Sequence, residues 1–313
     1  MTRFTLRQLQ YLVATARYGS LTAAAEALYV SQPSISAAIA QMEEHFGRTL
    51  LVRQRGSGVS VTAFGQNVLD RAKTVLDGIE ALEALSEDGD TPHGEFVLGC
   101  FEDLAPYCVP PILARVGKRY PGIHVIVREA GFDQLGRCLD EGVVDLAISY
   151  DLGLNNDVAR IVLCELHPQA MLPVDHPLAQ NESVTLAELA RETLVLTDQA
   201  QSWQHMLELF QMHGLRPQRA LRTGSFELQR SMVANGLGVA VAYSRPFSDF
   251  SYDGRALARR PIRDSLPAQR ILLAYPQRAP LSNAQKAFIE EARQWFAQTG
   301  WGTPVAAPAL AVG

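Results

Sequence analysis

The sequence predicts a protein in two parts. The first is a small all-α domain of the winged helix-turn-helix type with a long linker helix, and the second is an α/β domain made of two subdomains. Three observations predict this division: two short helices joined by a tight turn lie near the N-terminus, a long segment without proline follows, and the remainder alternates apolar strands with amphipathic helices. A length of 313 residues and a hydrophobic content of 47% leave room for two or three domains with a sizeable core.

The helix expected between residues 31 and 46 is the element around which the N-terminal part is organised. Ser31 is a good N-cap, and Pro33 stands in the first turn, where its missing N–H costs no hydrogen bond. Apolar residues recur at three- and four-residue steps along one face, at Ile35, Ile39, Met42 and Phe46. The other side chains near its start are short and neutral, namely Gln32, Ser34, Ser36 and Ala37. Such groups suit close approach to the major groove of DNA, where Gln and Ser can read base edges.

The segments on either side of this helix decide between two interpretations. Residues 20–28 form a short alanine-rich helix that begins with Ser20 and Thr22, two further expected DNA contacts, and alone would also fit an ordinary helical hairpin. Residues 50–62 read as two short strands around a Gly-Ser-Gly turn. Three residues of this hairpin are expected to contact phosphates: Arg53, Arg55 and Thr62. The hairpin therefore favours a winged helix-turn-helix that binds double-stranded DNA.

The distribution of charge supports DNA binding better than the net charge does. The whole chain carries a net charge of −5, which alone would argue against nucleic acid as a partner. Residues 1–62 nevertheless hold six arginines against three glutamates, a local excess of three positive charges. A dimer would double that excess and strengthen the attraction to phosphates.

A long helix is expected from Phe64 to about Ser86, because no proline interrupts this segment. Its apolar residues repeat in alternating steps of four and three, the pattern of a coiled-coil seam. The repeat comprises Val68, Ala72, Val75, Ile79 and Leu82, and it is widened by Leu69, Leu76 and Leu85. The pattern fits either a helix packed on its own domain or one that pairs with a second copy, and its length beside so small a domain favours pairing. Residues 87–94 are polar, with two Gly and one Pro, and read as a linker.

The second half of the chain shows the βαβ alternation of a largely parallel sheet, in two sets. Strands are expected at 96–100, 124–128, 145–150, 169–174, 194–196, 239–243 and 271–275. Helices are expected at 109–119, where the first turn holds Pro110-Pro111, and at 134–139, 186–191, 203–213, 226–235 and 283–298. Two such subdomains in series imply a cleft between them, and ligands of open parallel sheets bind outside the carboxyl ends of the strands.

Several motifs together resemble the LysR-type bacterial transcriptional regulators. They are Leu9-Gln-Tyr-Leu, Gly19-Ser-Leu-Thr-Ala-Ala-Ala, Ser31-Gln-Pro-Ser-Ile-Ser, Met42-Glu-Glu-His-Phe-Gly and Thr62-Ala-Phe-Gly65. The resemblance is dense over the first sixty-odd residues and continues more loosely to about residue 297. One position departs from the family pattern, because this chain has Ala37 or Ala38 where relatives commonly carry a basic or long polar side chain. Base readout is therefore expected to depend more on Gln32 and Ser34.

The resemblance implies a C-terminal domain similar to a periplasmic binding protein, with crossover strands near Cys164–Ala170 and Gln269–Ala274. It also implies a dimer through the linker helix that assembles into a homotetramer, an imperfect inverted repeat in a promoter as the DNA site, and a small-molecule effector. RNA polymerase is a further expected partner. The expected domains are 1–62 for DNA binding, 63–90 for the dimerisation helix and hinge, 91–299 for effector binding, and 300–313 as a disordered tail. Within the effector domain, subdomain I takes 91–165 and 271–299, and subdomain II takes 166–270.

The expected effector site lies at the strand ends and in the loops that follow them. It comprises Phe101, Glu102, Asp103, Phe132, Tyr150, Thr197, Ser202, Ser225 and Phe226. No Arg or Lys stands at these strand ends, whereas acids and aromatic rings are interleaved there, which favours a cationic or N–H-rich effector. Acids at such junctions also commonly cap helices, and that interpretation is favoured for each acid taken singly, with Glu102 as the best exception.

Other functional classes are disfavoured. No nucleophile elbow, zinc-protease motif or phosphate-binding glycine loop is present, so no catalytic residue is expected and the chain is not expected to be an enzyme. The four cysteines lack metal-ligand spacing and do not make a disulfide framework, so neither a metal nor a cofactor is expected. A signal segment and a long apolar run are both missing, which predicts a cytoplasmic protein without membrane contact.

The sequence therefore predicts a DNA-binding transcriptional regulator that is controlled by a small-molecule effector. A thiol redox sensor based on Cys100 is the closest rival, although no second cysteine is obviously placed to resolve its oxidised form. A transport binding protein would fit the second half of the chain but would have no use for the first ninety residues.

Overall fold

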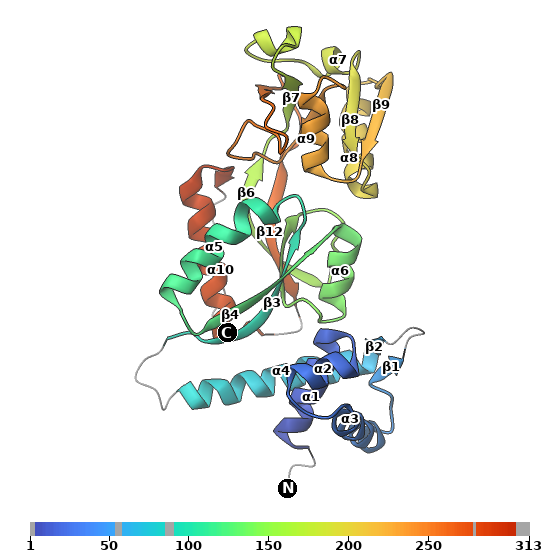
Figure 1. Cartoon of the computed structure of the whole chain (residues 1–313), viewed down its shortest axis with the longest axis vertical. Helices are drawn as coiled ribbons and strands as arrows, with labels where there is room; N and C mark the ends of the chain where they lie inside the picture. The colour runs from blue at the N-terminus through green and yellow to red at the C-terminus, as the bar shows by residue number, and fades with distance from the viewer. Residues whose placement is uncertain (1–3, 54–57, 85–90, 278–279, 305–313) are drawn as a thin grey trace.

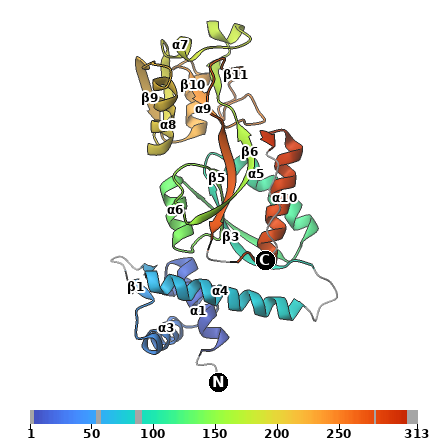
Figure 2. The ribbon, with the colours of Figure 1, turned by 180° about the vertical axis from the view of Figure 1, so that it is seen from behind.

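The structure of the chain, a computed structural model, describes residues 4–53, 58–84, 91–277 and 280–304. The N-terminal domain lies at one end, subdomain I with its large sheet in the middle, and subdomain II with two smaller sheets at the far end (Figures 1 and 2). The helices are α1 (Leu6–Tyr18), α2 (Leu21–Ala27), α3 (Gln32–Phe46), α4 (Ala63–Ala84), α5 (Ala105–Arg119), α6 (Phe132–Asp140), the 3-10 helix η1 (Pro177–Gln180), α7 (Leu186–Leu189), α8 (Ala200–Gln211), α9 (Phe226–Ala234) and α10 (Asn283–Thr299). The strands are β1 (Leu51–Arg53), β2 (Val59–Val61), β3 (Gly94–Phe101), β4 (Ile123–Ala130), β5 (Leu146–Tyr150), β6 (Val158–Leu166), β7 (Gln169–Pro173), β8 (Thr193–Thr197), β9 (Arg219–Thr223), β10 (Ala240–Ala242), β11 (Leu257–Pro261), β12 (Gln269–Pro276) and β13 (Thr303–Pro304).

The helices of the N-terminal domain begin and end where local signals place them. Thr5 caps α1 in a reciprocal capping box with Gln8, and Gly19 ends the helix in the left-handed conformation with φ of 61°. Ser31 caps α3, because its Oγ accepts a hydrogen bond from the N–H of Ser34 at 3.3 Å. The expected helix over 31–46 is confirmed, and so is the helix-turn-helix that it forms with the short helix before it.

The wing is an antiparallel pair of β1 and β2 in which Leu51 faces Val61. Helix α4 starts so close to this hairpin that a Cβ atom at Gly65 would lie 2.1 Å from the carbonyl oxygen of Leu50. A glycine at this position therefore lets α4 approach the backbone of the wing directly.

Helix α4 packs on α1 with one face and leaves another exposed. Leu69 and Ala72 are buried within the chain, whereas Val75 is 47% exposed. The predicted seam is thus divided, with part of it packed on the chain's own domain and part available to a second copy. The side chain of Leu82 and the whole of Leu85 lie outside the described residues.

Subdomain I is built on a six-stranded sheet in the order β13-β6-β12-β5-β3-β4. Strand β3 pairs in parallel with β4 and β5, whereas β12 pairs antiparallel with β5 and β6. The expectation of a largely parallel sheet therefore holds for β3, β4 and β5, but three of the five pairings are antiparallel, because β12 runs opposite to its neighbours β5 and β6 and β13 runs opposite to β6. Helices α5 and α10 pack together on one side of the sheet, and α6 lies on the other (Figures 1 and 2).

Subdomain II holds an antiparallel sheet in the order β10-β7-β11 and a parallel pair of β8 and β9. A parallel bridge between Leu194 and Val239 connects the two. Two links cross between the subdomains: β6 continues into β7, and β12 returns beside β6 with Gln269 opposite Leu166. Both expected crossover segments are confirmed.

Helix α5 begins earlier than predicted. It starts at Ala105, so that Pro110 and Pro111 lie inside the helix although each lacks the N–H that the helix needs. The face formed by Ala105, Cys108 and Ile112 is buried, and this packing offsets the cost of the two prolines. Strands β9, β11 and β13 were not predicted, and β6 was expected only at its end, within the crossover segment 164–170.

The predicted disordered tail is wrong over its first residues. Trp301 is only 3% exposed, and residues 303–304 pair with β6 as β13. The indole of Trp301 packs against the rings of Trp295 and Phe296 in α10, so burial of one large aromatic side chain orders this segment. Residues 305–313 lie outside the described part of the chain.

Candidate functional site

The first candidate surface is the start of α3. Pro33, Ser34 and Ala37 are exposed, and Gln32 and Ser36 are partly exposed. The opposite face of the helix is buried against α1 and α2. The side chains predicted to read bases therefore share the side of α3 that faces away from the core.

Internal hydrogen bonds already use several hydroxyl groups that were predicted to contact DNA. The Oγ atoms of Ser34 and Ser31 lie 2.7 Å apart. The hydroxyl of Thr62 accepts from the N–H of Gly65 at 2.8 Å and so caps α4. The hydroxyl of Ser20 accepts a backbone N–H at the start of α2. These three residues have a structural role whether or not DNA is bound.

The remaining predicted DNA contacts are Gln32, Thr22, Arg53 and Arg55, and the structure describes the side chains of the first two only. Among the described residues, Gln32 has no side-chain hydrogen bond within the chain, so its amide is free to meet a base edge. Thr22 is exposed on α2. The side chain of Arg53 and the whole of Arg55 lie outside the described residues.

Tyr29, in the turn between α2 and α3, is a residue that sequence reasoning did not select as a DNA contact. Its side chain is 96% exposed and its φ is 54°, a conformation that bulky residues rarely adopt. The turn thus holds an aromatic ring outward beside the start of α3. No sequence signal marks this position, because Gly and Asn are the residues that usually announce a positive φ.

The second candidate surface is a pocket between the two subdomains. Subdomain I contributes Phe101, Asp103, Phe132, Tyr150 and Leu152, subdomain II contributes Thr197, Ser202, His205, Met206, Phe226, Gln229, Val241, Ala242, Tyr243 and Ser244, and the crossover strand β12 contributes Gln269. The pocket encloses about 60 Å³. Sites for small molecules usually measure about 300–1,000 Å³. The structure therefore shows the cleft in a closed form.

Seven of the nine predicted effector residues line this pocket, and Glu102 and Ser225 do not. Glu102 lies at the rim, where it accepts a hydrogen bond from the amide of Gln199, and Ser225 caps α9. Asp103 is instead the acid that lines the pocket, which corrects the preference for Glu102. Residues 102–104 form a turn, so the alternation of side chains along β3 does not continue through them.

Sequence reasoning missed the part of the lining that comes from inside α8, from α9 and from β10 and β12. These residues are His205, Met206, Gln229, Val241, Ala242, Tyr243, Ser244 and Gln269, with Leu152 from subdomain I. Tyr243 and Ser244 lie at the end of the expected strand 239–243, which was not selected as part of the site, and the others lie at no strand end that was selected. Only the packing of subdomain II brings them to the cleft.

Polar contacts across the cleft hold it closed. They join Tyr150 to Ser244 at 2.7 Å, the hydroxyl of Tyr107 to Glu227, and the amide of Gln201 to Asp133. Each pair has one member in each subdomain. An effector that opens or reshapes the cleft must therefore replace these contacts.

Apart from the two tyrosines, two titratable groups in the pocket have a pKa that departs from its ordinary value. Burial raises the pKa of Asp103 to about 7, the carboxylate of Glu102 adds to the rise, and the N–H of Phe226 at the start of α9 opposes it. Burial lowers the pKa of His205, whose Nε2 lies 2.8 Å from Nε2 of Gln269. At neutral pH the histidine is uncharged, and Asp103 is the lining residue that can carry charge.

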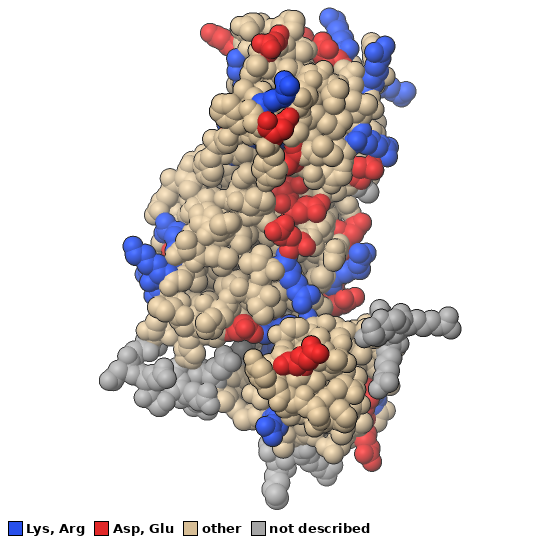
Figure 3. All heavy atoms as spheres, in the orientation of Figure 1, with Lys and Arg blue, Asp and Glu red and all other residues tan. Residues whose placement is uncertain are grey.

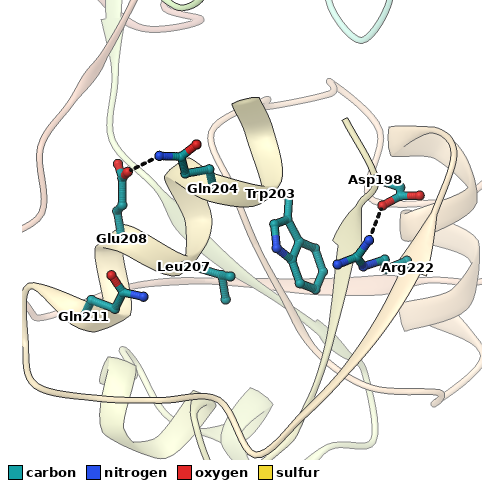
Figure 4. A pocket seen from close by; sticks show the side chains of 7 residues that line it. All are labelled: Asp198, Trp203, Gln204, Leu207, Glu208, Gln211 and Arg222. Carbon is teal, nitrogen blue, oxygen red and sulfur yellow. Dashed lines mark hydrogen bonds and ion pairs between the residues drawn. The ribbon is translucent and has the colours of Figure 1, made fainter. Parts of the chain in front are cut away.

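A larger hollow of about 520 Å³ lies on the outer face of subdomain II, between α8 and β9 (Figure 4). The guanidinium carbon of Arg222 lies 3.9 Å from the ring centroid of Trp203, and Arg222 also pairs with Asp198 at 3.0 Å. A hydrogen bond joins Gln204 to Glu208 on α8. This hollow does not join the subdomains, so we place the candidate effector site in the smaller pocket.

Ion pairs and a hydrogen bond connect the N-terminal domain to subdomain I. Lys73 of α4 lies 2.5 Å from the carboxylate of Asp145, which directly precedes β5. Arg128 of β4 donates to the carbonyl oxygen of Arg17 at 2.8 Å, and Arg17 pairs with Glu95 of β3. The helices α1 and α4 are thus attached to the sheet whose strand ends line the pocket.

Among the described residues, no group of three or more His, Cys, Asp or Glu is placed to hold a metal ion. In the same part of the chain, no helix is both long and apolar enough to cross a membrane.

Comparison with known proteins gives the family. The model described as "Bacterial regulatory helix-turn-helix protein, lysR family" matches residues 6–66, and the one described as "LysR substrate binding domain" matches residues 89–297. The DNA-binding transcriptional dual regulator OxyR of Escherichia coli is 31% identical over 241 residues, which are 75% of this chain and 78% of that protein. The regulator YvbU of Bacillus subtilis is 28% identical over 297 residues, covering 93% of this chain and 99% of that protein.

Solved structures agree with this result. The crystal structure of HinK, a LysR family transcriptional regulator from Pseudomonas aeruginosa, is similar with a TM-score of 0.63 and 30% identity, and the match covers 94% of this chain and 99% of that one. A full-length OxyR variant from Pseudomonas aeruginosa shares the fold, with a TM-score of 0.72 and 24% identity over 93% of this chain and 98% of that one. The two matched models describe a bacterial regulatory helix-turn-helix and a substrate-binding domain. The chain belongs to the LysR family of bacterial transcriptional regulators, with an N-terminal DNA-binding domain and a C-terminal effector-binding domain.

Proposed function

We propose that this regulator binds promoter DNA as an oligomer through α3 and the wing, and that a small molecule in the pocket between the subdomains changes the geometry of the complex. One observation carries the proposal. The chain joins a solvent-facing helix-turn-helix by direct polar contacts to the subdomain whose strand ends line a closed pocket. An enzymatic role is not proposed, because the relatives are transcriptional regulators.

At the DNA end, the start of α3 enters the major groove and Gln32 supplies the main base contact. Its amide can donate and accept at once, as adenine recognition requires. Ser34, Ser36 and Ala37 bring the helix close to the bases because they are short. Tyr29, held outward in the turn, contacts the sugar–phosphate backbone beside the groove.

Phosphate contacts are assigned to the flanking elements. Thr22 at the start of α2 and the wing arginines Arg53 and Arg55 are expected to contact the phosphates that flank the groove. Ser20, Pro33 and Thr62 act by shaping the helix starts that present these groups, since two of them are caps and the third stands in a first turn.

The effector site is assigned to the pocket. Phe101, Phe132 and Phe226 supply apolar contact, and Thr197 and Ser202 supply hydrogen bonds. The effector enters when the crossover segments let the cleft open. It then holds the two subdomains at an angle that differs from the one in the empty chain. Bound and empty chains differ in that angle, which is the population shift that regulates transcription.

A direct route exists from this pocket to the DNA-binding domain. Strand β5 ends at Tyr150 in the pocket and begins directly after Asp145, which pairs with Lys73 on α4. A displacement of Tyr150 that carries β5 with it therefore moves the attachment point of α4. Such a movement changes the spacing or bend that two copies impose on DNA.

The assembly is proposed to be a dimer through the exposed face of α4 that pairs into a homotetramer. Val75, 47% exposed in the single chain, lies on that face. A two-fold dimer matches an imperfect inverted repeat, because each copy of α3 reads one half-site. Contact with RNA polymerase is proposed for the promoter-bound form, which acts in the cytoplasm where the chromosome lies.

A thiol-based sensor is the second candidate, since relatives include the "Hydrogen peroxide-inducible genes activator" of Pectobacterium carotovorum, 29% identical over 294 residues. The thiol environment argues against it. Cys100, Cys108 and Cys164 are buried, and burial raises the pKa of Cys100 and of Cys164. The thiolate is the form that reacts with peroxide, so these thiols are expected to react slowly. Mass spectrometry of the chain after mild peroxide treatment would favour the sensor if a cysteine pair were oxidised quickly.

Selection of DNA sites from a random-sequence pool with the purified chain tests the DNA half of the proposal. We expect enrichment of an imperfect inverted repeat, and an unenriched pool would contradict it.

A thermal-shift screen of metabolites tests the effector half. Any compound that raises Tm is tested again on Ser202→Phe, whose larger side chain fills the pocket. A shift that survives this substitution would place the effector elsewhere.

A further inference from the structure

The charge of the pocket is one-sided. Asp103 and His205 are the acid–base groups that line it apart from two tyrosines, and no Lys or Arg is part of the lining. Burial lowers the pKa of His205, so this ring does not supply a positive charge at neutral pH. Figure 3 shows acidic side chains gathered over the middle of the molecule, at the level where the subdomains meet. A ligand in this pocket meets negative charge and no positive charge in the lining.

The rest of the lining presents aromatic rings. Phe101 and Phe132 are stacked with their centroids 4.0 Å apart, and Tyr150 meets Phe101 edge-on at 5.8 Å. The faces of aromatic rings attract cations, and this attraction grows when the pair is shielded from water. Aromatic rings beside a carboxylate in a closed pocket form the usual environment for an organic ammonium group.

The place where an anion would bind is already taken. The start of α9 points its first N–H, that of Phe226, at the carboxylate of Asp103. A ligand carboxylate would have to displace this side chain and remain next to its charge. The carboxylate of Asp103 thus lies at the start of α9, where the carboxylate of a ligand would otherwise bind.

On the basis of the effector site proposed above, we propose that the effector is a small organic cation, an ammonium or amidinium compound with a compact apolar body. Asp103 binds its charged N–H groups, Phe101 and Phe132 contact its apolar body, and Tyr150 and Ser244 exchange their mutual hydrogen bond for contacts to it.

The charged neighbours of Asp103 strengthen this preference. Glu102 in the same turn and Glu227 on α9 add negative potential at its carboxylate. Arg230 on α9 pairs with Glu227 and donates to the backbone carbonyls of Ser248 and Phe250, so it offsets part of the Glu227 charge and leaves Glu102 as the larger contribution. The other titratable groups nearby are uncharged near pH 7: His205 on α8, and four whose pKa is raised by burial or hydrogen bonding, Tyr107, Tyr150, Tyr243 and Cys164.

Proton linkage separates the ligand classes. With a pKa of about 7, Asp103 is about half protonated at pH 7 in the empty pocket. A cation binds the ionised form, so it releases about half a proton at pH 7 and binds more tightly at pH 8 than at pH 6. A carboxylate needs the protonated form and shows the opposite sign in both measurements.

The experiment uses the full chain and sets of probes with the same carbon skeleton. Each small amine or amidine, such as butylamine or benzylamine, is paired with the matching alcohol and carboxylate, and all are screened by thermal shift. Binders are then titrated by calorimetry in two buffers of different ionisation enthalpy at pH 6, 7 and 8. We expect the amines or amidines to raise Tm, to release protons, and to lose about tenfold or more in affinity with Asp103→Asn.

Two further variants make the outcome decisive. Asp198→Asn removes an exposed acid outside the lining and should leave binding unchanged. Ser202→Phe fills the pocket and should abolish binding of any cleft ligand. If the carboxylates bind and Ser202→Phe blocks them, the cationic inference is wrong and the effector site stands. Equal amine affinities for Asp103→Asn and the unsubstituted chain would also overturn the inference. If no probe of any charge gives a shift that Ser202→Phe removes, the inference fails as well, and the metabolite screen described above then decides the site itself.

Discussion

The DNA-binding end and the effector pocket differ in how far apart along the chain their parts lie. The helix-turn-helix is complete within residues 20–46, whereas the pocket joins Phe101 of β3 to Gln269 of β12. At the DNA end, caps and turns fix each helix locally, so one side chain can change without moving the others. In the pocket, strands and helices from two subdomains must keep their relative positions.

This difference teaches where each kind of control resides. A substitution on the surface of α3 is expected to change DNA affinity without changing the response to the effector, because α3 keeps its position on α1 and α2. A substitution in the pocket is expected to change the angle between subdomains and, through Lys73 and Asp145, the placement of α4. DNA affinity and the response to the effector are therefore set at different ends of the molecule, and α4 contacts both ends.

The largest expected effect concerns α4. Val75→Asp places a charge on the exposed face proposed to pair two copies, and the chain itself should still fold because Val75 is 47% exposed. We expect the dimer to dissociate and DNA affinity to fall by about 100-fold or more, because two half-sites are no longer bound together. Light scattering gives the mass and a mobility shift gives the affinity. Thr74→Asp, exposed one position earlier on the same helix, is the control, and an unchanged mass for Val75→Asp would assign this face to something other than pairing.

A second prediction concerns the stability of the empty pocket. Because the pKa of Asp103 is raised from 3.8 to about 7, the folded state binds its proton more tightly than the unfolded chain does. The stability linked to this group is therefore present below pH 3.8 and lost as pH rises through 7. A fully buried group would lose about 4 kcal/mol, and partial exposure reduces this to about 2 kcal/mol.

Asp103→Asn removes that loss, so urea unfolding should find the variant more stable than the unsubstituted chain at pH 8 and similar to it at pH 4.5. The comparison sharpens the contrast between the two ends of the molecule, because an ordinary polar residue at the DNA end should show no such dependence on pH. A variant that is less stable than the unsubstituted chain at pH 8 would mean that the ionised carboxylate stabilises the pocket.

The third prediction tests whether affinity is separable at the DNA end. Gln32→Ala should weaken binding to the selected site by about 1–3 kcal/mol and binding to random DNA very little, because a base contact is lost and phosphate contacts remain. Gln41→Ala is the matched control, since Gln41 lies on the same helix but bonds to Gln8 at 3.0 Å. Mobility shifts on both DNAs measure the difference. Equal losses on the two DNAs would remove Gln32 from base readout.

The smallest effect is expected at the connection between the two ends. Lys73→Met removes the ion pair with Asp145 while keeping the length of the side chain, and Lys118→Met on the exposed surface of α5 is its control. The pair is partly buried, so we expect a loss of about 0.5–1 kcal/mol in the free energy of unfolding for Lys73→Met and less for the control. Urea titrations of both variants decide the matter, and equal stabilities would mean that this contact does not hold α4.

The same contrast explains how far the sequence could be interpreted. The helix-turn-helix was predictable almost residue by residue, because Ser31 and Gly19 act on their own neighbours. The location of the pocket was predictable, but the full set of residues that line it was not. Asp103 and Glu102 are adjacent, and only the turn after β3 decides which of them enters the cleft.

The elements that were not predicted have causes of the same kind. Strand β9 has four exposed residues in a row and no alternation, since it is an edge strand held by β8. Helix α5 runs through Pro110 and Pro111 because a buried face on the sheet outweighs a local penalty. Trp301 orders a segment whose composition suggested disorder, because its ring packs on Tyr107 of α5 as well as on the end of α10, and its indole N–H donates to the carbonyl oxygen of Arg245. In each case a long-range contact overrides the local signal.

The central claim is that the state of the pocket sets the geometry of the DNA complex, and Ser202→Phe tests it without knowledge of the effector. The phenylalanine ring fills the cavity of about 60 Å³ and exceeds it, so we expect this variant to hold the cleft open with the pocket blocked. The site selected by the full chain is footprinted, and its bend measured, with the unsubstituted chain and with the variant. We predict a footprint or bend that differs between the two, with α3 contacting the same bases in both. An identical footprint, bend and affinity would show that the pocket does not control the DNA complex.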